Sequence, residues 1–400
     1  MPNKDRNIPK RRFKEFENED AWELRKLGEV VYRSNITSSS KVLPRLEFED
    51  INSGLGTLNK DIFQKVNDDR KGLEFNEGDV LFGKLRPYLK NWWYAEFNGI
   101  ALGDFWNLKS DVWHSCFLYT YIQSNAFQLV ANDTSGTKMP RSDWNLVAES
   151  IAKFPTLPEQ SAIGTFFSTL DQQITLHQRK LDKLKHVKQA YLSEMFPAEG
   201  ERVPKRRFPG FTDAWELRKL GELAEIVRGA SPRPIQDPKW FDEQSEIGWL
   251  RISDVTEQDG RIYHLEQKIS KLGQQKTRVL VEPHLLLSIA ATVGKPVVNY
   301  VKTGVHDGFL IFLEPRFEQE FMFQWLEMFR SSWSKYGQPG SQVNLNSDLV
   351  KNQELSIPTH PEQEAIGTFF STLDQQITLH QRKLEKLKNL KKALLNELFV

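Results

Sequence analysis

Two patterns in the sequence contain residue types that enzymes use for acid–base and phosphodiester chemistry. Asp259, Glu266 and Lys268 resemble the Asp…Glu-x-Lys arrangement of nucleases, although their spacing is loose. His306 and Asp307 are adjacent, as in an acid–base pair. An isolated pair of this kind ahead of an apolar run is more typical of a turn. Neither pattern is specific enough to predict a catalytic site.

Nucleotide, metal and methyl-transfer motifs are incomplete or missing. A phosphate-binding loop requires a glycine five residues before Gly294-Lys295 and a Ser or Thr after it, but Ile289 and Pro296 stand there. The sequence has no HExxH segment and no pair of cysteines for zinc. It also lacks an Asn-Pro-Pro motif with aromatic neighbours. We therefore expect no catalytic residues and no metal site in this chain.

Cations in acid-free segments give a stronger signal. Residues 80–95 and 267–281 contain basic but no acidic residues. Basic side chains bind phosphates, whereas Arg, Lys, Asn and Gln also read base edges. The alternative is a set of ordinary solvated turns. The predicted DNA-binding residues are Lys84, Arg86, Lys90, Ser135, Thr137, Lys138 and Arg141 in the first half, and Lys276, Arg278, Lys295, Ser341, Gln342, Asn344 and Asn346 in the second.

The composition is that of a multidomain globular protein. The chain has 400 residues, a net charge of +1 and a single cysteine, Cys116. This length predicts two to three domains. The lone cysteine excludes a disulfide framework and fits a reducing cytoplasm. No apolar run is long enough to span a membrane, and the polar start does not resemble a signal peptide.

A long repeated helix must position these candidate residues. Residues 162–181 and 365–384 are identical, within similar segments at 158–196 and 361–400. Their apolar residues recur every three or four positions, which predicts two helices paired along a narrow seam. The predicted seam residues are Ile163, Phe167, Leu170, Ile174, His177, Leu181, Leu184, Ile366, Phe370, Leu373, Ile377, His380, Leu384 and Leu387.

Local signals at these helices suggest where they begin and end, and what two of the seam residues do. Thr156 with Glu159, and its repeat at Thr359, have the spacing of a capping box. Pro197 ends the first helix. His177 and its equivalent in the second helix are polar seam residues that set the helix register. A metal or pH-sensing role is the alternative for these histidines.

The repeat extends to the segments that precede each helix. IPKRRF at 8–13 returns as VPKRRF at 203–208, and AWELRKLGE at 21–29 returns at 214–222, where we expect a short amphipathic helix. The units between these segments differ in sequence and have short strand-like runs, which predicts an α+β fold with mostly antiparallel sheets. The predicted order is leader 1–20, domain 21–157, helix 158–196, linker 197–213, domain 214–360 and helix 361–400.

These motifs together resemble the specificity subunits of type I restriction–modification systems. The resemblance covers essentially the whole chain. It rests mainly on the repeated PEQ-x-AIG…LD-x-QI…HQRKL helix. The W-x-x-x-x-LG opening of each unit, the GD-V-L-F…R-P-Y-L segment at 78–89 and the G-[ST]…SD loops before each helix are weaker supports. At the Arg86-Pro87-Tyr88 position the second unit has Gly294-Lys295-Pro296 instead.

The resemblance implies two target recognition domains, each reading half of a split double-stranded DNA sequence, and an antiparallel coiled coil between them. It implies two modification (methyltransferase) subunits as partners, with restriction (translocase and nuclease) subunits. S-adenosylmethionine, ATP and Mg would belong to those partners, with no cofactor in this chain. One alternative function is a two-module DNA-binding regulator or scaffold without an enzyme partner. Another is an enzyme that acts on nucleic acid by itself.

Overall fold

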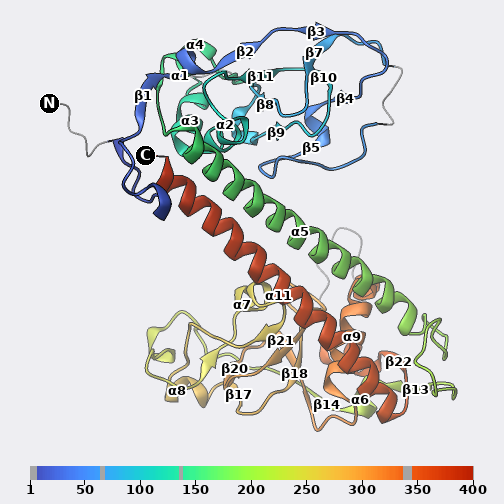
Figure 1. Ribbon diagram of the computed structural model, residues 1–400. Coiled ribbons are helices and arrows are strands. Elements are labelled where there is room, and N and C mark those ends of the chain that lie inside the picture. Colours follow the sequence, from blue (N-terminus) through green and yellow to red (C-terminus); the bar gives the residue numbers. More distant parts are fainter. Residues whose placement is uncertain (1–6, 64–67, 135–137, 337–344, 400) are drawn as a thin grey trace. The chain divides into compact units, whose positions relative to one another are not determined.

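The computed structural model describes residues 7–63, 68–134, 138–336 and 345–399. The chain forms two compact units. The first unit comprises Met1–Leu181 together with Leu379–Val400, and the second comprises Asp182–Thr378. Each unit therefore contains one globular part and a portion of both long helices, coloured green and red in Figure 1. The division into domains by sequence segment stays a prediction.

The globular part of the first unit contains two four-stranded sheets. The order of the antiparallel sheet is β2 (Tyr32–Ser34), β11 (Phe105–Lys109), β8 (Val80–Gly83) and β9 (Trp92–Tyr94). The order of the mixed sheet is β3 (Thr37–Ser38), β7 (Gly72–Phe75), β10 (Gly99–Ala101) and β4 (Arg45–Leu46). A small ribbon joins β5 (Ile51–Asn52) and β6 (Thr57–Leu58). Helices α2 (Ser115–Tyr121), α3 (Asn125–Ala131) and α4 (Trp144–Glu149) follow. Buried aromatic rings, among them Phe75 and Trp93, fill the core.

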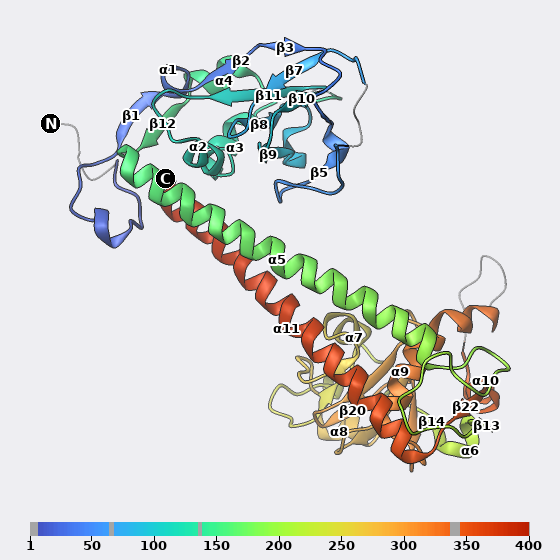
Figure 2. The same ribbon diagram turned by 45° about the vertical axis from the view of Figure 1, so that its right-hand side comes forward.

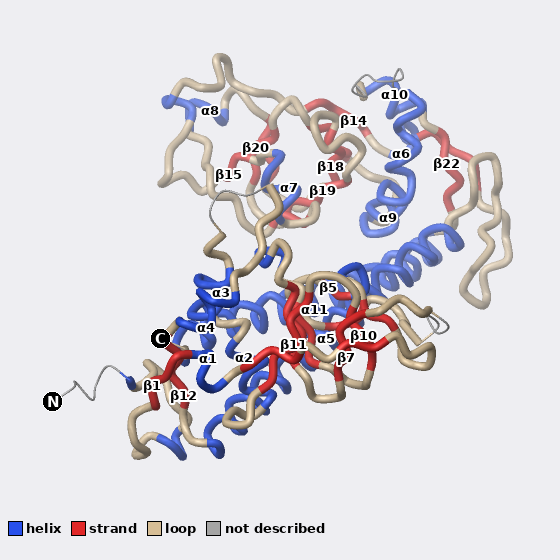
Figure 3. The backbone as a smooth tube through the Cα atoms, turned by 90° about the horizontal axis from the view of Figure 1, so that it is seen from above, coloured by secondary structure: helices blue, strands red, loops and turns tan. Residues whose placement is uncertain are grey.

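The second unit repeats this design with a larger sheet. Its order is β14 (Glu225–Arg228), β21 (Phe309–Leu313), β18 (Leu285–Ser288), β19 (Pro296–Asn299) and β16 (Arg261–Ile262). A three-stranded sheet contains β15 (Gly248–Trp249), β20 (Thr303–Val305) and β17 (Arg278–Leu280). Its helices include α7 (Ile252–Glu257), α8 (Lys271–Gln274), α9 (Gln319–Phe329) and α10 (Ser347–Asn352). Figure 3 shows the strands in red. The short strand-like runs expected in this unit correspond to strands such as β18, β19 and β21.

The repeated WELRKLGE segment forms a strand before its helix, so the prediction of a single short helix was wrong. In the first unit β1 (Glu23–Lys26) pairs with β12 (Ile151–Phe154), the strand that leads into the long helix. In the second, β13 (Glu216–Lys219) pairs with β22 (Glu354–Ile357) in the same way. The helical turn is confined to α1 (Leu27–Val30) and α6 (Leu220–Leu223). Hydrogen bonding to a distant strand overrides the local helical pattern.

The long helices are α5 (Leu157–Met195) and α11 (His360–Leu398). In the first unit Asp171, early in α5, pairs with Lys391, late in α11, at 2.5 Å. In the second unit Lys188, late in α5, pairs with Asp374, early in α11, also at 2.5 Å. Within each unit the two helices therefore run in opposite directions, as Figures 1 and 2 show. The predicted α+β fold with two long paired antiparallel helices is confirmed.

Candidate nucleic-acid interface

The structure brings together two loops of the first unit that the sequence singles out. Beyond the end of β8, the Arg86 amide donates to the Pro140 carbonyl at 2.7 Å, and the Ser142 amide donates to the Lys84 carbonyl at 2.9 Å. Asp104 lies between the cations, 3.5 Å from Lys84 Nζ and 3.0 Å from Arg141 Nη2. Lys84, Arg86 and Arg141 therefore occupy one surface region. Lys138, in the same second loop, is exposed.

The first of these loops has an unusual backbone. Arg86 (φ 49°) and Lys90 (φ 57°) both adopt the left-handed conformation, on either side of a 3-10 turn at Pro87–Leu89. This conformation is uncommon for residues other than glycine and persists only where the surroundings enforce it. The turn leaves Tyr88 56% exposed, between two exposed cations. A cationic loop with a protruding aromatic ring is suited to contact with nucleic acid.

The second-unit candidates lie in different environments. Lys276 and Arg278 are exposed near the start of β17. Lys295 is only 8% exposed, and its ammonium pairs with Glu327 and, at 2.6 Å, with Asp259. Burial opposes the charge, but these two carboxylates raise the pKa of Lys295. The charge of Lys295 is thus compensated inside the unit. The two acids that compensate it come from distant parts of the sequence.

The remaining predicted residues are not part of a described binding surface. Asn346 precedes α10, and its Oδ1 accepts a hydrogen bond from the Leu349 amide at 2.9 Å, so its side chain caps this helix. Five predicted residues lie outside the part of the chain that the structure describes: Ser135, Thr137, Ser341, Gln342 and Asn344.

The catalytic patterns in the sequence do not form sites. Asp259 pairs with Lys295, whereas Glu266 pairs with Arg251 at 3.4 Å. His306 Nδ1 accepts a hydrogen bond from the Gly308 amide at 2.8 Å, and this contact closes a turn. The described residues contain no cluster of three or more His, Cys, Asp or Glu suited to a metal ion.

The arginines of the repeated KRRF motif have a structural role that the sequence patterns did not predict. Arg12 donates to both carboxylate oxygens of Glu159, at 2.8 and 2.6 Å, and Trp22 Nε1 donates to the same group at 3.3 Å. Arg207 binds both oxygens of Glu362 in the second unit, at 2.6 and 2.7 Å. The KRRF and PEQ motifs recur together in both halves of the chain, and this joint recurrence could have indicated that the arginine and glutamate pair.

The glutamine of each PEQ motif attaches its long helix to the globular part. Gln160 Nε2 donates to the Pro155 carbonyl, and its Oε1 accepts from the His114 amide at the start of α2. Gln363 makes the same two bonds, to Pro358 and Glu318, at the start of α9. The two units thus use identical residues to seat different globular parts on the helices.

The predicted seam residues are all buried or half-buried. Nine are buried: Ile163, Phe167, Leu170, Ile174, Leu181, Ile366, Phe370, Ile377 and Leu384. Leu184, Leu373, Leu387, His177 and His380 are half-buried. The Nδ1 atoms of the two histidines are 2.8 Å apart. Burial lowers the pKa of His177, and the charges of His380, Lys383 and Lys180 lower it further.

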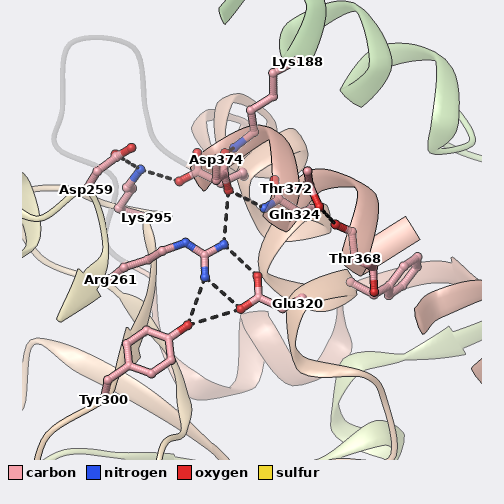
Figure 4. A network of polar contacts seen from close by, with 12 residues as sticks. Lys188, Asp259, Arg261, Lys295, Tyr300, Glu320, Gln324, Thr368, Thr372 and Asp374 are labelled. Carbon is pink, nitrogen blue, oxygen red and sulfur yellow. Dashed lines mark hydrogen bonds and ion pairs between the residues drawn. The ribbon is translucent and has the colours of Figure 1, made fainter. Parts of the chain in front are cut away.

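A polar network in the second unit joins its sheet to both long helices (Figure 4). Arg261, in β16, forms two hydrogen bonds with Glu320, at 2.8 and 2.7 Å, and a third with Asp374 at 3.2 Å. Asp374 also binds Lys188 of α5 and accepts from Gln324 at 2.8 Å. In the first unit the corresponding Lys391 binds Asp171 and Gln123, at 2.5 and 2.6 Å.

Neutralising the first-unit loops tests their role in binding. We expect the quadruple replacement of Lys84, Lys138, Arg86 and Arg141 by alanine to weaken binding to targets carrying the first half-site, because phosphate contacts are lost. The dependence of affinity on salt should fall by about one unit of slope for each phosphate contact removed. Fluorescence anisotropy across a salt titration measures both effects. An unchanged titration would place the DNA face elsewhere on this unit.

Comparison with known proteins agrees with this architecture. Residues 212–389 match the family model described as the type I restriction modification DNA specificity domain. The chain is 26% identical over 134 residues to the specificity subunit of the type I restriction enzyme EcoDI of Escherichia coli, covering 32% of this chain and 29% of that protein. It is 22% identical over 218 residues to the MjaVIII specificity subunit of Methanocaldococcus jannaschii, covering 53% and 47%. The chain thus spans less than half of each curated relative.

Solved structures show the same fold over nearly the full length. The S subunit of a type I restriction–modification system from M. genitalium superposes with a TM-score of 0.63 at 14% identity, covering 98% of this chain and 99% of that one. A chain from a structure on assembly and conformational transition of a type I system gives 0.53 at 20% identity, with coverages of 94% and 96%.

The chain therefore shares with these solved structures a fold of two α+β units on paired antiparallel helices. The family match lies in the second half of the chain, and the identical helix repeat carries the same pattern into the first half. Over residues 212–389 the chain matches the type I restriction modification DNA specificity domain, and its sequence is similar to the specificity subunits of two type I restriction enzymes. Among its described residues, no helix is long and apolar enough to cross a membrane.

Proposed function

We propose that this chain recognises a bipartite double-stranded DNA target, with one half-site read by each unit. The observation that carries the proposal is the constant frame: identical helix segments and leader contacts support two globular units whose sequences differ. A constant support with divergent units is suited to reading two unrelated sequences at a set separation. The paired cationic loops at Lys84, Arg86 and Arg141 supply a phosphate-binding surface on the first unit.

The partners that fit this role are two modification subunits, one for each copy of the repeated frame, together with restriction subunits. Methyl transfer and cleavage would then be carried out by the partners with S-adenosylmethionine, ATP and Mg. The chain would be their non-catalytic guide, in the cytoplasm where the DNA lies. Native mass spectrometry of the co-purified complex tests the stoichiometry. A single modification subunit per chain would contradict the two equivalent surfaces.

A DNA-binding regulator or scaffold is the alternative function. Such a protein would bind split sites but would not affect DNA modification. Methylation mapping in a host that carries the chain and its modification subunit separates the two functions. Under our proposal, one split motif is methylated, and deletion of the chain abolishes that methylation. An unchanged map would favour the regulator.

The long helices should set the gap between the half-sites. An insertion of about four residues in the middle of α5 lengthens the helix by ~6 Å and adds about one turn. We expect the methylated motif to keep both half-sites but to change the number of base pairs between them. Methylation mapping of the insertion variant beside the wild type gives the readout. The same gap in both maps would show that the helices do not determine spacing.

A further inference from the structure

The segment that follows β14 is held tightly against a turn of the second unit. Residues 228–234 read RGASPRP. The Gly229 amide donates to the Phe309 carbonyl at 2.9 Å, and the Ala230 amide donates to the Val305 carbonyl at 3.0 Å. A Cβ atom on Gly229 would lie 2.1 Å from the His306 carbonyl oxygen, so this position requires glycine. The segment is therefore held close to the turn that contains Asp307.

Three exposed arginines meet at this turn, and we name them the Asp307 arginine cluster: Arg228, Arg233 and Arg278. Arg233 Nη2 pairs with Asp307 Oδ2 at 2.6 Å while its side chain stays 72% exposed. Arg228 Nε donates to the Asp307 carbonyl at 2.6 Å, and Arg278 Nε donates to the Arg228 carbonyl at 2.8 Å. Backbone oxygens thus orient two of the guanidinium groups without neutralising them.

The charge of this cluster is not balanced. In the described contacts, Asp307 is the carboxylate that lies among the three arginines. It also accepts a hydrogen bond from Ser231 Oγ at 2.7 Å. Other exposed cations of the second unit each pair with an acid of their own: Arg218 pairs with Glu216, and Lys302 pairs with Glu246. Exposed Lys276 adds another cation next to the cluster in sequence. The region therefore carries excess positive charge on partly pre-oriented donors.

We propose that the Asp307 arginine cluster binds backbone phosphates of the DNA half-site read by the second unit. The inference rests on the proposed function and adds Arg228 and Arg233 to its binding residues. Guanidinium groups bind phosphate oxygens through paired N–H donors, and such contacts position a protein on DNA. Lys295, which lies in an internal ion-pair network, serves the folded unit instead of the DNA.

The test compares two triple variants of the full chain that remove equal charge. The first carries Arg228→Gln, Arg233→Gln and Arg278→Gln. The control carries Arg218→Gln, Lys239→Gln and Lys302→Gln, which removes exposed cations that each pair with a carboxylate. Binding to a fluorescent 40-bp duplex of mixed sequence is measured from low to moderate salt. Thermal unfolding of each variant checks the fold.

We expect the cluster variant to bind about ten- to a hundredfold more weakly at low salt, with the salt slope reduced by about two to three. The control should bind nearly as the wild type does. Equal affinity of the cluster variant and wild type, or equal losses in both variants, would overturn the cluster as a phosphate site. A wild-type chain that binds no duplex would instead refute the proposed DNA-binding function.

Discussion

Replacing Arg12 with alanine should lower the free energy of unfolding by about 3 kcal/mol or more. The reason is the burial of both partners: side-chain exposure is 5% for Arg12 and 0% for Glu159. Removing one member of a buried ion pair leaves an uncompensated charge, which typically costs about 3–5 kcal/mol. The bond to Trp22 Nε1 would remain but supplies no charge. Denaturant unfolding followed by circular dichroism gives the measurement.

The neighbouring Arg11 supplies a matched control. It pairs with Glu397 at 2.8 Å, but side-chain exposures of 62% and 37% make this a surface contact. Its replacement should cost less than about 1 kcal/mol. The second unit offers the same comparison between Arg207, which is bound to buried Glu362, and Arg206, which pairs with exposed Glu194. Equal losses for Arg11→Ala and Arg12→Ala would refute the structural role of the buried pair.

The second large effect is expected for Asp374→Ala. This substitution removes the carboxylate that Lys188, Gln324 and Arg261 share, and leaves the half-buried Lys188 ammonium without its partner in the network. We expect a loss of about 3 kcal/mol in the stability of the second unit. Glu364→Ala, at an exposed site of the same helix, should change stability by less than about 0.5 kcal/mol. A small loss for both would show that the network does not anchor the helices.

This network also predicts the response to acid. Burial opposes ionisation of Asp374, but Lys188, Gln324 and Arg261 together lower its pKa below the ordinary value of 3.8. The contribution to stability is therefore present above pH 3.8 and is lost as the pH falls through the lowered pKa. The equivalent Asp171 has a raised pKa because burial outweighs its pairing with Lys391. Because the contribution of Asp374 is lost in acid, the free energies of unfolding of Asp374→Ala and of the wild type should converge at low pH.

The elements with the clearest local patterns were predicted well from the sequence. The heptad spacing predicted both long helices to within about two residues, and the matching frames predicted equivalent sheets in the two units. The prediction of a helix at the WELRK segment was wrong because its partner strand lies more than 120 residues away and no local pattern encodes that pairing. A strand that depends on a distant partner takes its conformation from tertiary contacts.

The candidate binding residues were less predictable for a similar reason. Acid-free runs identified exposed cations at Arg86 and Arg278. A further acid-free run contains Lys295, whose acidic partners come from other elements. Arg228 and Arg233 were missed because their segment has no long acid-free run and becomes cationic only beside Arg278. Charge balance is a property of the folded surface, so linear windows recover only part of it.

The composition of the compact units has a consequence for the order of synthesis. The first unit includes residues 379–400, which the ribosome adds only after all of residues 182–378 have been made. Phe399 packs against Trp22, Phe117 and Tyr121, with ring centroids 6.1, 5.5 and 5.7 Å apart. Part of the aromatic core of the globular part that is translated first therefore stays uncovered until residues 379–400 have been made. A nascent chain stalled before residue 379 would expose that surface to chaperones, whereas the second unit would already hold all its residues.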